Sequence, residues 1–167
     1  MSKEILYSNS WKETEKNSVL AAMERNDCVV HAIASACKVS YEEAHAFVKD
    51  IFKRRDKKGT RNVMLKMSEL SKAFNVKVTE LGEKDEKGVK KLTQSYRMHG
   101  KTKVGRYTTV SFIKKFPTGT YIMFVRGHAF TIIDGVVHGN SDDATKRRVR
   151  VEQAFKVEQA FKVEQKS

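Results

Sequence analysis

Apolar residues recur at helical spacing in the first third of the chain. Within residues 28–37 they stand at positions 29, 30, 33, 36 and 37, which follow one face of a helix. Asn26 or Asp27 precedes this run and can cap its first turn. A second helix begins where Ser40-Tyr41-Glu42-Glu43 forms a capping box. We therefore expect two packed helices in this part of the chain.

A different pattern begins at Tyr121. Residues 121–125 form a continuous apolar run typical of a buried strand, and residues 128–133 form a second one. Asp134-Gly135 has the composition of a type I′ turn, which pairs residues whose numbers sum to 269. Because helices come before strands, the pattern indicates an α+β fold in which N-terminal helices pack on a C-terminal antiparallel sheet.

The pattern is weaker between these two regions. Residues 68–74 predict a short helix, and the alternation at 76–79 predicts a strand. Residues 88–96 carry a faint helical pattern. Thr109 can cap a helix over residues 110–116.

The C-terminal segment contains a repeat. VEQAFK occupies residues 151–156 and again 157–162, and VEQ follows at 163–165. A period of six keeps the same side chains on one face of a strand, whereas on a helix successive valines would lie about 240° apart. We expect the first copy to be a last strand and the later copies an exposed extension, so that residues 1–150 form a single domain and residues 151–167 a tail. The residues expected to share one strand face are Val149, Val151, Phe155, Val157, Phe161 and Val163.

Length and composition narrow the class of protein. The 167 residues suit one domain, and 40% hydrophobic residues with a single proline argue against a disordered chain. No window approaches 18 uninterrupted apolar residues, and the first residues lack the pattern of a signal peptide. We expect a cytoplasmic protein with no membrane partner, in the host cytoplasm if a phage encodes it.

The net charge of +13 is concentrated in three segments. Residues 53–66 carry +6, residues 84–115 carry +8 and residues 146–167 carry +4, whereas 1–52 and 116–145 each sum to −2. Such excess is common in proteins that bind nucleic acid. Two interpretations stay open for 53–66 and 84–115: a polyanion or nucleic-acid partner, or a solvated lysine-rich surface.

Two cysteines raise the question of thiol chemistry. Cys28 and Cys37 lie nine residues apart in one predicted helix, on opposite faces and about 13 Å apart along its axis, so they cannot form a disulfide. We interpret Cys37 as a residue of the hydrophobic core. Cys28 begins the helix, where the backbone amides stabilise a thiolate and can stabilise the oxyanion of an acyl-transfer intermediate. Cys28, His31, His128 and His138 match no familiar zinc spacing.

A histidine and a polar cluster follow about a hundred residues later. His128 begins a predicted strand and could act as general base and acid for a thiol nucleophile. Residues 140–143, Asn-Ser-Asp-Asp, could orient its imidazole.

These residues resemble the papain-like cysteine peptidase superfamily, in particular its minimal bacterial and phage members and the bacteriocin-processing peptidases. The resemblance rests on residues 26–30, NDCVV, and 127–135, GHAFTIIDG, and covers roughly residues 25–143. It implies a peptidase or isopeptidase that forms an acyl-enzyme on a peptide or protein substrate, without metal or cofactor. Cys28 would be the nucleophile, His128 the base and acid, and Asn140 or Asp142 the orienting residue.

Two positions depart from that superfamily. Where it places a glutamine as oxyanion donor this chain has Ala22, so Asn26 or Asn17 would have to substitute. The expected register sets His128 opposite Ser141, unless a bulge near Gly139 shifts it. The alternative is a papain-like binding module or phage-type effector that lacks turnover and binds nucleic acid or a host protein through its basic loops.

Overall fold

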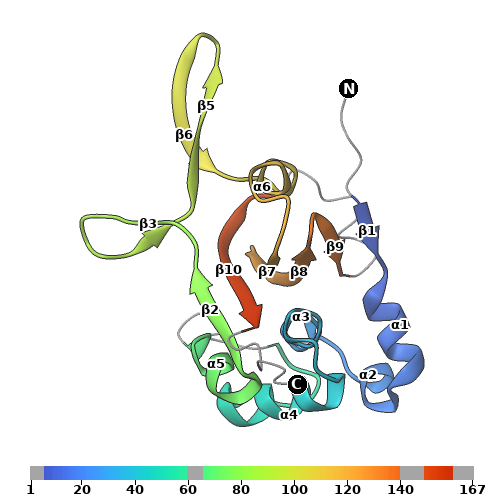
Figure 1. The fold of residues 1–167 in the computed structure, drawn as a ribbon. Helices are drawn as coiled ribbons and strands as arrows, with labels where there is room; N and C mark the ends of the chain where they lie inside the picture. The colour runs from blue at the N-terminus through green and yellow to red at the C-terminus, as the bar shows by residue number, and fades with distance from the viewer. Residues whose placement is uncertain (1–5, 60–65, 140–148, 160–167) are drawn as a thin grey trace, which may run out of the picture.

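The computed structural model describes residues 6–59, 66–139 and 149–159 (Figure 1). A six-stranded sheet runs through it in the order β1-β9-β8-β7-β10-β2. β1 pairs parallel with β9, and the other neighbours pair antiparallel. In sheet order, the strands are β1 (Leu6–Ser8), β9 (Val136–His138), β8 (His128–Ile133), β7 (Thr120–Val125), β10 (Val151–Gln159) and β2 (Val76–Glu80).

Helices cover both faces of this sheet (Figure 1). One face packs against α3, behind which lies α4, and the other packs against α6. Two short antiparallel hairpins, β3–β4 and β5–β6, lie outside the main sheet. The helices are α1 (Ser10–Asn17), α2 (Val19–Met23), α3 (Cys28–Cys37), α4 (Tyr41–Ile51), α5 (Glu69–Phe74) and α6 (Thr109–Lys115). The hairpin strands are β3 (Glu83–Lys84), β4 (Lys90–Lys91), β5 (Thr93–Met98) and β6 (Lys101–Arg106).

The fold is mixed α and β, as the sequence pattern indicated, and α3 is its most enclosed helix. Val30, Ala32 and Ile33 are fully buried between α4 and the sheet. Thr131 on β8 donates a buried hydrogen bond to the Ala32 carbonyl at 2.8 Å, which fixes the helix against the strand. No helix among the described residues is long and apolar enough to cross a membrane.

Most of the strong local signals are confirmed. The helix over residues 28–37 is present, and Ser40 caps α4 by accepting from the Glu43 amide at 3.1 Å. β8 has its predicted bounds, and Asp134 and Gly135 have the positive φ values of a type I′ turn. The β8–β9 register is the predicted one, with Ile133 opposite Val136.

Three predictions of secondary structure are wrong. The faint helical pattern at 88–96 belongs to β4 and β5, because His99 and Gly100 adopt positive φ and fold the chain back as a hairpin. The cap of α6 is Thr108, one residue earlier than predicted. The sheet is neither wholly C-terminal nor wholly antiparallel: β1 is three residues long and forms through its parallel pairing to β9, which a local pattern cannot reveal.

The repeat forms an inner strand of the sheet. β10 contains the whole first copy, as predicted, and also Val157 to Gln159 of the second, which the prediction placed in an exposed extension. The expected single face is also wrong. A register shift between Val151 and Gln153 reverses the alternation of side chains along β10. Val151 therefore packs in the core on the α6 side of the sheet, whereas Phe155 and Val157 pack in the core on the α3 side.

Candidate functional site

Cys28 is the first residue of α3 and is half-buried, whereas the rest of that helix is mainly buried. Its side chain packs against the core cluster that includes Ala129, the neighbour of His128. Asp27 occupies the N-cap position, but its side chain makes no capping hydrogen bond. The N–H groups of a first helical turn have no acceptor within the helix, so this end of α3 can donate hydrogen bonds to a negatively charged group.

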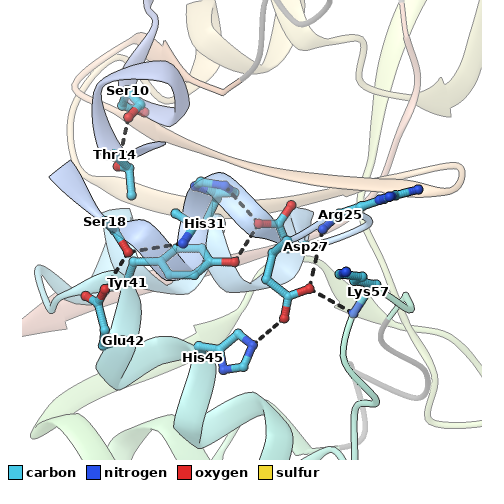
Figure 2. Close-up of polar contacts among 12 residues, drawn as sticks. Ser10, Thr14, Ser18, Arg25, Asp27, His31, Tyr41, Glu42, His45 and Lys57 are labelled. Atoms are coloured by element: carbon cyan, nitrogen blue, oxygen red, sulfur yellow. Dashed lines mark hydrogen bonds and ion pairs between the residues drawn. The ribbon is translucent and has the colours of Figure 1, made fainter. Parts of the chain in front are cut away.

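The Asp27 carboxylate is engaged with α3 and α4 instead. Its Oδ2 accepts from the Tyr41 hydroxyl at 2.6 Å and lies 3.1 Å from His31 Nε2 (Figure 2). Burial alone would raise the pKa of Asp27, but the contacts with His31 and Tyr41 outweigh it and lower that pKa. Asp27 therefore stays ionised and ties the start of α3 to α4, immediately before Cys28.

Trp11 of α1 contacts two histidines. Its indole stacks on His31, with ring centroids 4.5 Å apart, and lies 5.5 Å from the ring of His128. Trp11 is buried, and its Nε1 has no hydrogen-bond partner among the residues that the structure describes. The structure therefore links His128 to α3 through Trp11 and His31.

His128 begins β8 at a point that β9 does not pair with, since β9 pairs with residues 131–133. Its ring lies 5.9 Å from that of Phe130, on the same face of the strand. Thr131, with the opposite alternation, faces α3. The imidazole therefore lies beside Trp11, on the strand face opposite to that of Thr131, at a residue of β8 that pairs with Val125 of β7 but not with β9.

The remaining predicted site residues contribute less here. Asn140 and Asp142, the candidates for orienting His128, lie outside the described residues. The Asn26 side chain, the candidate oxyanion donor, donates to the Lys57 carbonyl at 3.1 Å. Asn17 donates to the Glu13 carbonyl within α1. The backbone amides at the start of α3 are therefore the better candidates for an oxyanion.

A buried ionic cluster, which no sequence pattern predicted, joins Glu24, at the end of α2, to α4 and the segment after it. Arg54 forms a two-pronged pair with Glu24, at 3.1 and 3.2 Å, and His45 Nε2 lies 2.5 Å from the same carboxylate. The Lys57 amide also donates to Glu24 at 2.8 Å. Burial tends to raise the pKa of Glu24, but these hydrogen bonds hold it at about 2. Arg54 is therefore structural and offers no charge to a polyanion, contrary to its inclusion in the basic loop 53–66.

This cluster does not form a metal site. Glu24, His45 and Asp56 are close enough to share an ion. However, the Arg54 guanidinium lies 3.1 Å from Glu24 and 3.5 Å from His45, so a cation already neutralises the carboxylate. Among the described residues, no group that could share a metal includes Cys28, His31, His128 or His138.

The structure has a polar cleft of about 760 Å³, and Cys28 does not line it. It runs between α1, the second half of α3 and the start of α4, with His138 at one side. Tyr41 belongs both to this cleft and to the Asp27 contact, so it connects the two regions.

Replacing Tyr41 with phenylalanine should lower the free energy of unfolding by about 1.5–3 kcal/mol, because a buried hydrogen bond to a carboxylate is lost. Tyr121→Phe is the matched control: its hydroxyl donates to the neutral Thr118 carbonyl at 2.9 Å, and the loss should be about 0.5–1.5 kcal/mol. Urea unfolding monitored by circular dichroism measures both. Equal losses in the two variants would contradict the charged role assigned to Asp27.

The sequence predicted Cys28 and His128 as site residues, which stays a prediction, but it did not reveal the contacts among Asp27, His31, Tyr41 and Trp11. Asp27 and His31 are four residues apart on a helix, a spacing that could have revealed their contact. Trp11 and Tyr41 come from other helices and gave no local signal.

No family model, curated protein or solved structure matches this chain.

Proposed function

We propose that this protein is a cysteine hydrolase of papain-like type, a peptidase or isopeptidase with Cys28 as its nucleophile. The observation that supports this most is the placement of Cys28: a half-exposed thiol at the first position of a buried helix whose N-cap side chain is turned away to Tyr41 and His31. The backbone amides of that turn can stabilise the oxyanion that forms when the thiol attacks a carbonyl carbon.

In the proposed reaction Cys28 is the nucleophile, and His128 acts first as an acid and then as a base. Cys28 Sγ attacks the carbonyl carbon of the substrate, and the amides of the first turn of α3 stabilise the resulting oxyanion. His128 protonates the leaving group as the acyl-enzyme forms, and then removes a proton from the water that hydrolyses the thioester. Trp11 restricts the position of the His128 ring, with Asn140 or Asp142 as the further orienting group.

Alkylation by iodoacetamide at pH 6 tests the nucleophile without knowledge of the substrate. A thiol of ordinary acidity is almost wholly protonated at this pH. We expect native Cys28 to react at least about ten-fold faster than the same cysteine in the unfolded chain, because the proposed mechanism requires an activated nucleophile at this position. Mass spectrometry of the labelled peptides gives both rates.

Cys37 is the internal control for this experiment. It is buried at the other end of α3, and burial raises the pKa of its thiol to about 12, so it should stay unlabelled in the native protein. Cys28→Ala should abolish labelling, and Cys37→Ala should leave it unchanged. Labelling of native Cys28 no faster than in the unfolded chain would overturn the proposed function.

A further inference from the structure

The hairpin of β5 and β6 stands away from the body of the protein (Figure 1). Its two strands pair along their whole length, from Thr93 opposite Arg106 to Met98 opposite Lys101. Every residue in it is at least partly exposed, and Val104 is 68% exposed. Neither face of this ribbon therefore covers a core of the protein.

The charge of the hairpin has one sign. Residues 93–106 contain four basic residues and no acidic one, whereas the neighbouring β3–β4 hairpin mixes lysines with acidic residues. The register distributes the basic side chains over both faces. Lys101 and Lys103 share one face with Tyr96, and Arg97 and Arg106 share the other.

Internal contacts hold the ribbon in shape. Arg97 donates to Thr102 Oγ1 at 3.2 Å and to the Gly100 carbonyl at 2.8 Å, which braces the turn. Tyr96 lies over Gly105, where a Cβ atom would come within 3.1 Å of its ring. Arg106 has a loose, exposed contact with Glu152 at 3.8 Å. The turn of the hairpin is thus held by internal hydrogen bonds, and its basic side chains are exposed rather than neutralised in close ion pairs.

We propose that the β5–β6 hairpin is a binding arm for duplex DNA. The major groove of B-form DNA admits a two-stranded ribbon, and basic residues on both faces can reach the phosphates on both walls. Charge complementarity favours a polyphosphate, and the absence of an apolar face argues against a protein partner that would bury one. The major groove of duplex RNA is too narrow for side chains to read. This proposal is independent of the proposed hydrolase.

Binding of a fluorescent 20-base-pair DNA duplex, followed by anisotropy, tests the proposal. Four phosphate contacts would make affinity fall by about 100-fold between 50 and 200 mM salt. The hairpin variant combines Arg97→Gln, Lys101→Gln, Lys103→Gln and Arg106→Gln, and should bind at least about 100-fold more weakly at 50 mM salt. Its circular dichroism and its Cys28 labelling should match those of the parent chain.

A control variant separates the hairpin from the total charge of the protein. Lys12→Gln, Lys16→Gln, Lys72→Gln and Lys77→Gln together remove the same charge from exposed positions on α1, α5 and β2, and should preserve binding to within about three-fold. Equal losses in the two variants would overturn the proposal. Binding of single-stranded DNA, duplex RNA or poly-glutamate as tightly as duplex DNA would overturn it as well.

Discussion

Replacing Glu24 with glutamine should lower the free energy of unfolding by about 3–5 kcal/mol, because it leaves the Arg54 charge buried without an anion. The side chains of Glu24 and Arg54 are 3% and 1% exposed. Solvent therefore cannot replace the lost carboxylate. Glutamine keeps only one of the two side-chain oxygens, so either His45, which contacts Oε2, or the Lys57 amide, which donates to Oε1, loses its acceptor too. Chemical unfolding at neutral pH gives the difference directly.

The same pair should make the protein sensitive to acid. The folded pKa of Glu24 is about 2, below its ordinary value of 4.5, so the carboxylate stabilises the fold fully above about pH 4.5. That contribution is lost as the pH falls from about 4.5 towards 2. The stability difference between the parent chain and Glu24→Gln should therefore shrink over this window, because glutamine does not titrate.

An exposed carboxylate provides the control. Glu69 lies 4.0 Å from Lys72 on α5, and the two side chains are 39% and 81% exposed, so Glu69→Gln should cost less than about 1 kcal/mol. Arg54→Met should lower the free energy of unfolding about as much as Glu24→Gln does. The double variant should lose less than the sum of the two single losses. Additive losses would show that Glu24 and Arg54 do not act as a pair.

The parts of the fold that could be predicted from the sequence are those in which neighbours along the chain determine structure. The Asp134-Gly135 turn needs positive φ at two successive residues, and this alone fixed the pairing of β8 with β9. The Ser40 cap is equally local. Such signals require no knowledge of distant segments.

Elements whose stability comes from distant segments were missed or misread. β1 forms because β9 accepts it, and residues 93–98 become a strand because the two-residue turn at His99-Gly100 returns β6 alongside them. In β10, the hexad repeat predicted a strand, but it could not predict the irregularity after Val151 that divides its side chains between two cores.

The candidate site shows the same division. The position of Cys28 at a helix start could be predicted, since the capping pattern and the apolar spacing are local. The side chains that contact Asp27 and His31, its neighbours on α3, come from other segments: Tyr41 from α4 and Trp11 from α1, which in turn contacts His128 of β8. The orientation of the imidazole depends on those contacts, and so could not follow from spacing.

Cys28→Ala should slow the release of nitrophenolate from p-nitrophenyl acetate by at least about 1,000-fold. In the parent chain Cys28 Sγ attacks the ester carbonyl, a carbon–sulfur bond forms, and the carbon–oxygen bond to nitrophenolate breaks. The product is an acetyl thioester, which water then hydrolyses to acetate and free thiol. Absorbance should show a burst equal in amount to the protein, followed by slower turnover.

His128→Asn distinguishes the nucleophile from its base. It should leave the Cys28 sulfur in place but slow the turnover after the burst by about 100-fold or more, since water must then react without a general base. Cys37→Ala should change neither phase, because that thiol is buried at the opposite end of α3. A burst that survives Cys28→Ala would exclude Cys28 as the nucleophile, and an unchanged turnover in His128→Asn would exclude the imidazole as its base.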